Sequence, residues 1–251
     1  MNKKLTYKTQ KQFTFDDIEK DLFQLHNQLR QNPQSYIPKL KDYLKYFRNK
    51  IYHPPGEDPI QTYEGQDAFD DAISFLKSQK QVEPLELNEY ITSACREHAY
   101  DIGEKGLTTH EGTTTKNISE RLEKYCEWDG ACSESIDLGF KSAENILINL
   151  LVDDGVSNRY QRLNLFNPKF KYIGIAVGIH IEYGICVVIG YAMNIRPLGS
   201  EPKNMSESIQ EYIQKTYNNK KKVVGGKLKK ITKKVFLLDN GAQHIVEVEE
   251  A

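Results

Sequence analysis

The sequence contains little cysteine, with four in 251 residues, and this scarcity argues against a fold held together by disulfide bonds. Cys95 and Cys186 fall in apolar patterns that are typical of buried free thiols. Cys126 and Cys132 are close enough in sequence to form a bridge or to bind a metal, but no Cys-x-x-Cys motif accompanies them. We therefore expect reduced thiols at these two positions as well.

The N-terminal segment lacks an apolar stretch. Residues 1–13 carry lysines at the front with no apolar core behind them, so they do not form a signal peptide. We expect a cytoplasmic protein that is not secreted. The sequons at Asn117 and Asn204 would then stay unmodified.

An uninterrupted apolar run of membrane-spanning length is also missing. The most apolar segment, Ile173 to Ala192, is long enough, but His180, Glu182 and Tyr183-Gly184 interrupt its middle. Its many β-branched residues and its polar break predict two strands joined by a turn, and no transmembrane segment.

Net charge of either sign is nearly absent, since the formal charge is -1 and the isoelectric point is about 6.6. The protein as a whole therefore has no field that requires nucleic acid or an anionic membrane. Residues 220–234 are the local exception, because they hold no acid. Their eight lysines are Lys220, Lys221, Lys222, Lys227, Lys229, Lys230, Lys233 and Lys234.

This lysine segment is a candidate partner-binding site for an acidic surface, such as nucleic acid, anionic lipid or the acidic tails of a cytoskeletal filament. More often such a run is a solvated face. Aromatic residues are not interleaved with the lysines, which makes nucleic acid an unlikely partner.

Apolar residues make up 39% of the chain, enough for the core of one domain of about 150 to 180 residues. Thr14 with Asp17 predicts a capping box that starts the first helix, and Asn32-Pro33 starts the second. We interpret His26 and Arg30 as part of a solvated helix face. Apolar residues at helical spacing mark the helices: Ile18, Leu22, Leu25, Leu29; Tyr36, Leu40, Tyr43, Leu44, Phe47; Phe69, Ala72, Ile73, Leu76; Leu87, Ile91, Ala94, Cys95, His98, Ile102; Ile118, Leu122, Tyr125; Ile146, Leu147, Leu150, Leu151.

Glycine and proline place the loops between these helices. Residues 48–65 are a surface loop, Gly103 and Gly106 end the helix that begins near Asn88, and Asp129-Gly130 forms a turn after Trp128. We divide the chain into N-terminal helices and a loop (1–83), a core with a cleft (84–196), a polar, lysine-rich linker (197–234) with one short helix around 209–213, and a C-terminal hairpin (235–251) that turns at Asp239-Asn240-Gly241.

The stretch from His110 to Phe166 holds the candidate chemistry. His110 lies in a turn rich in Thr and Gly, and we place Glu134 and Asp153 among turns and short helices that can bring them to one point. Imidazole nitrogen and carboxylate oxygen are good zinc ligands and can carry protons near neutral pH. Each residue also has a structural interpretation: His110 can pin the Thr113–Thr115 loop, and Asp153 can belong to the turn before Gly155. His98 lies on an apolar helix face and is more simply a hydrogen-bonded core residue.

An ordered series of motifs carries a resemblance to a known family. The series is LHNQLRQNP, then Thr109-His110-Glu111-Gly112, Arg121 and Tyr125, Ser133-Glu134-Ser135-Ile136, Asp153-Asp154-Gly155-Val156, residues 158–168, and Ile173-Gly174-Ile175-Ala176. It resembles the CAP superfamily (the SCP domain of cysteine-rich secretory, antigen 5 and pathogenesis-related proteins), in the shorter form found in bacteria and protists, over roughly residues 20 to 196. The resemblance implies a three-layer α/β/α sandwich whose cleft is lined by two histidines and two acidic residues.

The sequence departs from the family pattern inside the cleft. Tyr160-Gln161 stands where the family usually has Gly-His, and an amide is a poor zinc ligand that cannot transfer a proton. Serines flank Glu134 in place of Gly and Asn, and Asp153 stands where a longer Glu is expected. We therefore interpret the cleft as a partly dismantled site.

Two function classes follow. The first is a non-enzymatic cytoplasmic binding or scaffold protein, without a cofactor, that engages a larger assembly, such as a microtubule or ciliary lattice, through its surface and basic tail. The second is a zinc-assisted hydrolase or lipid-binding protein, in which His110 and Glu134 bind the ion or activate water, Asp153 assists and Gln161 orients the substrate. CAP relatives are linked with zinc, sterol or lipid binding and disputed proteolysis, so the resemblance does not choose between the classes.

Overall fold

The computed structural model describes residues 14–198, 222–224, 227–237 and 243–250. The α-helices are α1 (Phe15–Gln31), α2 (Tyr36–Tyr43), α3 (Gln66–Ser78), α4 (Glu89–Lys105), α5 (Ile118–Leu122), α6 (Ala143–Val152) and α7 (Tyr160–Phe166), with 3-10 turns η1 (Pro33–Ser35) and η2 (Leu44–Tyr46). The strands are β1 (Phe47–Arg48), β2 (Ile51–Tyr52), β3 (Ile60–Gln61), β4 (Glu86–Leu87), β5 (Cys126–Leu138), β6 (Tyr172–His180), β7 (Gly184–Pro197), β8 (Lys222–Val224), β9 (Lys227–Leu237) and β10 (Gln243–Glu250).

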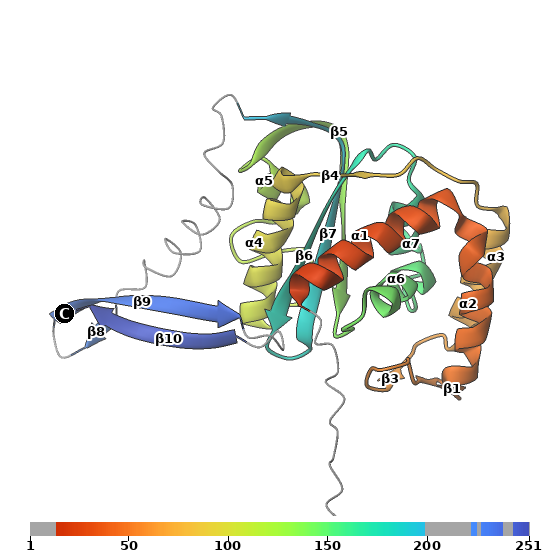
Figure 1. Cartoon of the computed structure of the whole chain (residues 1–251), viewed down its shortest axis with the longest axis horizontal. Helices are drawn as coiled ribbons and strands as arrows, with labels where there is room; N and C mark the ends of the chain where they lie inside the picture. The colour runs from red at the N-terminus through yellow and green to blue at the C-terminus, as the bar shows by residue number, and fades with distance from the viewer. Residues whose placement is uncertain (1–13, 199–221, 225–226, 238–242, 251) are drawn as a thin grey trace, which may run out of the picture.

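The central sheet has the strand order β4-β6-β7-β5. β7 pairs antiparallel with β6 and β5, while the short β4 runs parallel to β6. Apolar residues on the two sheet faces form two separate cores, one with α4 and α5 and the other with α1, α2, α3, α6 and α7. Figure 1 shows α4 and α5 on one side of β6 and β7, and α6, α2 and α3 on the other. The predicted three-layer α/β/α sandwich is confirmed.

Local signals place the helix ends well. Thr14 and Asp17 form the predicted capping box of α1, and Asn88 accepts hydrogen bonds from the backbone N–H groups of Tyr90 and Ile91 at the start of α4. Gly106 ends α4, as predicted, and the structure shows it in the left-handed conformation. Gly103, in contrast, does not end this helix. A Cβ there would lie 2.0 Å from the carbonyl oxygen of Ile179, so glycine lets α4 pack directly on β6.

The prediction for residues 126–138 is wrong. Trp128 and Asp129-Gly130 do not close a turn, and Glu134 does not lie in a turn or short helix, because all belong to the long strand β5. The local turn signal at Gly130, with a φ of 84°, corresponds to a bulge where the register with β7 shifts between Asp129 and Cys132. The strand then presents Glu134 toward the core of α4 and α5, and Ser133 and Ser135 toward the opposite face.

The interpretation of His26 and Arg30 as a solvated face is also wrong, because both side chains are fully buried. The Arg30 guanidinium donates hydrogen bonds to the carbonyl oxygens of Glu83, Leu165 and Asn167. His26 contacts the hydroxyl of Tyr191 at 3.2 Å, and burial lowers its pKa to about 3. Distant backbone carbonyls thus accept the hydrogen bonds of the Arg30 guanidinium, and the Tyr191 hydroxyl contacts one nitrogen of His26, although the helix periodicity placed both residues toward solvent.

One strongly perturbed carboxylate lies on the α6 side of β5. Asp137 is 2% exposed, and its Oδ2 accepts a hydrogen bond of 2.6 Å from Asn149 of α6, while its Oδ1 has no partner among the described residues. Burial raises the pKa of Asp137 to about 7, and the hydrogen bonds from Asn149 and from the backbone of Phe140 only partly oppose this effect.

The segment from Ile173 to Ala192 folds as predicted, with β6 and β7 joined at residues 181–183. Buried His180 holds this turn, since its Nδ1 accepts the N–H groups of Glu182 and Tyr183 and its Nε2 contacts the carbonyl oxygen of Leu107. All four cysteines are free thiols.

The C-terminal strands form a sheet of their own, with the order β10-β9-β8. The two strands expected around Val235 and Ile245 are present and pair antiparallel. Part of the segment predicted as a linker is strand, because β8 and most of β9 lie between residues 222 and 234, where Val, Ile and Thr between the lysines favour extended structure. The short helix predicted around 209–213 and the turn at 239–241 lie outside the described residues.

Candidate functional site

The loop that carries His110 is held by side chains from α4. Asp101 accepts hydrogen bonds of 2.5 Å from both the backbone N–H and the hydroxyl of Thr113. His98 contacts the carbonyl oxygen of Thr109 through Nε2 at 3.1 Å. At Gly112 a Cβ would come within 2.5 Å of the Asp101 carboxylate, so a larger residue there would require this side chain to shift. The loop therefore presents His110 from a fixed base, with half of its side chain exposed.

Glu134 is the anionic centre of the site. Its carboxylate is 3% exposed and accepts hydrogen bonds from His110 Nδ1 at 2.9 Å on Oε1 and from Arg121 at 2.6 Å on Oε2. Burial alone would raise the pKa of Glu134, but the hydrogen bond from His110 and the charge of Arg121 outweigh it, so this pKa lies below its ordinary value. Glu134 is thus held as an anion, and each of its two oxygens accepts a hydrogen bond.

Arg121 and His98 complete this cluster. The Arg121 guanidinium is fully buried and also donates to the carbonyl oxygen of His110 and the hydroxyl of Thr115, so it joins α5 to the loop. His98 Nε2 lies 3.7 Å from Glu134 Oε1, and burial lowers the pKa of His98. The helical spacing identified His98 as a core residue, and only its nonlocal contact with Glu134 of β5 brings it to the site.

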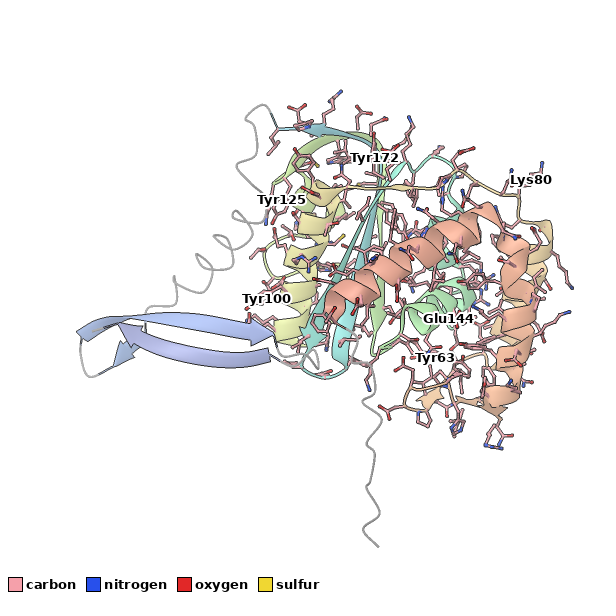
Figure 2. The ribbon with its side chains drawn as sticks, in the orientation of Figure 1. Tyr63, Lys80, Tyr100, Tyr125, Glu144 and Tyr172 are labelled. Carbon is pink, nitrogen blue, oxygen red and sulfur yellow. The ribbon has the colours of Figure 1, made fainter. Side chains whose placement is uncertain are left out.

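Tyr125 fastens the segment after α5 to α4. It follows α5, and its hydroxyl donates to Glu97 of α4 at 3.0 Å. Figure 2 shows Tyr125 beside α4, on the side of the sheet that carries α5. Lys124 also contacts Glu97, at 2.5 Å, so the segment after α5 is fastened to α4. These contacts keep the Arg121 helix close to the site.

Asp153 and Gln161 contact each other and the start of α7. Asp153 ends α6 in the left-handed conformation and accepts hydrogen bonds from the backbone N–H groups of Gln161 at 2.9 Å and Arg162 at 3.3 Å. The Gln161 side chain donates to Asp153 Oδ1 at 3.3 Å and accepts the Ile136 N–H at 3.0 Å. Burial raises the pKa of Asp153, although these donors oppose the effect. Asp153 caps α7, and none of these hydrogen bonds reaches His110 or Glu134.

Tyr160 covers the surface beside His110. The two rings lie edge to face with centroids 6.4 Å apart, and the Tyr160 hydroxyl contacts Ser133 Oγ. Ser133 donates to Asn164 at 2.9 Å, which in turn donates to Ser135 at 3.1 Å. A tyrosine where the family pattern has glycine therefore fills space at the cleft, and a buried polar network fixes it.

The structure brings only part of the predicted site together. His110 and Glu134 are in direct contact, whereas Asp153 is bonded to Gln161 and the start of α7. Within the part of the chain that the structure describes, no three or more His, Cys, Asp or Glu side chains are grouped to hold a metal ion. Of the eight candidate partner-binding lysines, Lys220 and Lys221 lie outside the described residues, and the other six lie on β8 and β9.

The model of the family described as "CAP: Cysteine-rich secretory protein family" matches residues 23–189. The chain belongs to the CAP family. Its match includes His110, Glu134, Asp153 and Gln161 and ends before the C-terminal strands. No curated protein matches the chain.

Two solved structures are similar to this CAP protein. An extracellular protein containing an SCP domain from Bacillus anthracis is 16% identical with a TM-score of 0.37, over 51% of this chain and 40% of that one. An outer surface protein from Borrelia burgdorferi is 14% identical with a TM-score of 0.39, over 55% of this chain and 98% of that one. The chain thus spans less than half of the Bacillus protein. No helix in the described ranges of the CAP protein is long and apolar enough to cross a membrane.

Proposed function

We propose that this CAP protein acts by binding and not by catalysis, as a cytoplasmic scaffold whose cleft is degenerate. Its partner is a larger assembly with an acidic surface, such as a microtubule or ciliary filament, which it engages through the domain surface and the lysine-rich C-terminal strands. No cofactor takes part in this function.

The proposal rests mainly on the hydrogen bonds that the Glu134 carboxylate accepts. A zinc ligand must offer a lone pair, and here one carboxylate oxygen accepts a hydrogen bond from Arg121 and the other from His110. Arg121 is also a permanent buried cation 2.6 Å from the carboxylate, and it disfavours a second cation at the same place. A zinc ion at this carboxylate would therefore bind beside a buried cation, at oxygens that already accept these hydrogen bonds.

The remaining cleft positions support the same conclusion. Gln161 uses its amide oxygen for the Ile136 N–H and its amide nitrogen for Asp153, so it has little freedom to serve a ligand. Asp153 caps α7. The residues at the family's cleft positions therefore satisfy one another, which is what a structural role requires.

One observation favours zinc-assisted hydrolysis or lipid binding as the second candidate. The His110 ring is half exposed, and the contact between its Nδ1 and Glu134 leaves Nε2 available to a proton, a metal or a ligand. In that function His110 would hold the ion or activate water, with Glu134 fixing its orientation.

Metal content separates the two candidates. Zinc is titrated by calorimetry into the wild-type protein and into His110→Ala, with His53→Ala as a matched control because His53 lies in the surface loop outside the cleft. We expect no stoichiometric zinc binding by any of the three proteins. Stoichiometric zinc that His110→Ala abolishes and His53→Ala retains would favour the second candidate.

The partner is tested by capture with the full chain and with a chain that ends at Pro197, after the last central strand. We expect the specific partners to be lost on truncation. Retention of the same partners would assign binding to the surface of the CAP domain and would contradict the role of the lysine-rich strands.

A further inference from the structure

Glu57 fastens the surface loop before α3 to the start of α6. Its Oε1 accepts hydrogen bonds from the backbone N–H groups of Lys141 and Ser142, at 2.8 and 3.0 Å, and from the Asn145 side chain at 3.2 Å. The Asn145 amide also donates to the carbonyl oxygen of Pro55 at 3.0 Å. The donors on α6 thus use one oxygen of the Glu57 carboxylate, whereas Oε2 is buried and has no hydrogen-bond partner among the described residues.

Asp137 approaches the same helix from β5. Its Oδ2 accepts the hydrogen bond from Asn149, and its Oδ1 is buried with no partner in the described part of the chain. Asn145 and Asn149 are one turn apart on α6, and side chains at this spacing lie about 6 Å apart on the same side of a helix. Glu57 and Asp137 are each bonded to one of these asparagines, so the two carboxylates are held near each other. The charge of Glu57 is accordingly one of the causes that raise the pKa of Asp137.

These two carboxylates have no cation from the protein beside them. Lys141, which is next to the start of α6, pairs instead with Asp58 at 3.7 Å. Within the described residues, neither Glu57 nor Asp137 forms an ion pair with a basic side chain. Burial of two carboxylates without a positive charge is unfavourable, and a water molecule could satisfy their lone pairs but would not balance their charge. Only a proton or a metal cation would supply the missing positive charge.

We propose that Glu57 and Asp137 bind a structural Ca²⁺ ion, with Glu57 Oε2 and Asp137 Oδ1 as its carboxylate ligands. Carboxylate and carbonyl oxygens are the ligands that Ca²⁺ prefers, and it accepts irregular geometries that water completes. The Pro55 carbonyl lies beside Asn145 and is an oxygen of this kind. The site offers neither His nor Cys, which zinc sites usually contain.

This Ca²⁺ site goes beyond the proposed binding function and is separate from the cleft. Asp137 and Glu134 are three residues apart on β5 and therefore lie on opposite faces of the sheet. The ion would fasten the loop around Glu57 to β5 and α6, which makes its role structural. Because the protein supplies only two carboxylates, we expect a dissociation constant of about 0.1 to 1 mM.

The test compares thermal unfolding of the full chain at pH 8 in EDTA and in about 10 mM CaCl₂. Asp137 is mostly ionised at this pH, because its pKa is about 7. The variants are Asp137→Asn and Glu57→Gln, which keep the shape of each side chain. Asp58→Asn is the matched control, because its carboxylate neighbours Glu57 in the sequence and is 94% exposed. The response of each protein is its own change in Tm, so differences in basal stability between the variants cancel.

We expect Ca²⁺ to raise the Tm of the wild type and of Asp58→Asn by about 3 to 5 °C, and to leave the Tm of the other two variants unchanged. Calorimetric titration should show one Ca²⁺ ion per wild-type chain and none in Asp137→Asn. The absence of a wild-type response would overturn the proposal and leave a proton as the missing charge. An equal response in all four proteins would place the ion elsewhere and would overturn it as well. Partner capture by the truncated chain tests the proposed function and does not bear on this site.

Discussion

Replacement of Asp137 by asparagine is expected to stabilise the protein at alkaline pH. The carboxylate is 2% exposed and one of its oxygens has no partner among the described residues. Its pKa is raised from 3.8 to about 7, mainly by burial. Because one pKa unit corresponds to about 1.4 kcal/mol, the ionised carboxylate lowers the free energy of unfolding by about 4 kcal/mol above pH 7.

The direction of the Asp137 pKa shift determines the pH range over which the stability of the protein changes. The folded-state pKa lies above the unfolded value, so the unfolded chain loses this proton first as the pH rises. The stability of the wild-type protein that depends on Asp137 is fully present below about pH 4 and is lost between pH 4 and 7. The asparagine side chain in the Asp137→Asn variant carries no charge and removes this dependence, although its amide nitrogen would itself lack an acceptor and would reduce the gain.

Urea unfolding at several pH values between 4 and 8 measures the effect. We expect Asp137→Asn to exceed the wild type by about 2 to 4 kcal/mol at pH 8 and to show no gain at pH 4. Asp58→Asn is the matched control, because the Asp58 side chain is 94% exposed, and it should change stability by less than about 0.5 kcal/mol at every pH. A stability difference for Asp137→Asn that does not vary with pH would refute the reasoning.

Three further predictions concern His26, Gln161 and Asp153. The folded-state pKa of His26 is about 3, below its ordinary 6.5, so the free energy of unfolding of the wild type should fall as the pH drops from 6.5 toward 3, by about 2 kcal/mol at pH 5. His26→Gln should flatten this dependence of stability on pH in acid unfolding curves, and an unchanged dependence would contradict the lowered pKa of His26. Gln161→Ala leaves the Ile136 N–H without its acceptor and should lower the free energy of unfolding by about 1 to 3 kcal/mol, whereas denaturant midpoints equal to the wild type would show that the amide contributes nothing there. Asp153→Ala removes the carboxylate that caps α7 and should cost about 1 to 2 kcal/mol, with faster amide hydrogen exchange at the start of α7; unaltered exchange would argue against the cap.

Features that depend on short stretches of sequence were predictable. The capping box at Thr14, the cap at Asn88, the left-handed Gly106 and the turn after His180 each follow from residues within a few positions of one another. The family resemblance supplied the arrangement of layers, because the order of its motifs spans most of the domain. Two of the candidate site residues, His110 and Glu134, are in direct contact in the structure.

Features that depend on distant partners were not predictable from the residues alone. The sequence predicts a turn at Asp129-Gly130 because this dipeptide is a local turn signal, whereas the pairing of β5 with β7 is not visible in the local sequence. Arg30 and His26 looked solvent-exposed because their acceptors come from segments far along the chain. Arg121 gave no signal that would separate a buried charge from a surface one. Only the contact with Glu134 shows that its charge is buried at the site.

The buried guanidinium of Arg30 limits where the protein can be truncated. It ties the first helix to residues 83, 165 and 167, which come from two other parts of the domain. A recombinant fragment that begins at residue 84 would expose carbonyl groups that have lost their donor, together with the apolar surface that Leu22 and Leu29 cover. The helices before residue 84 are thus an integral layer of the fold, and a soluble minimal version of this protein must include them.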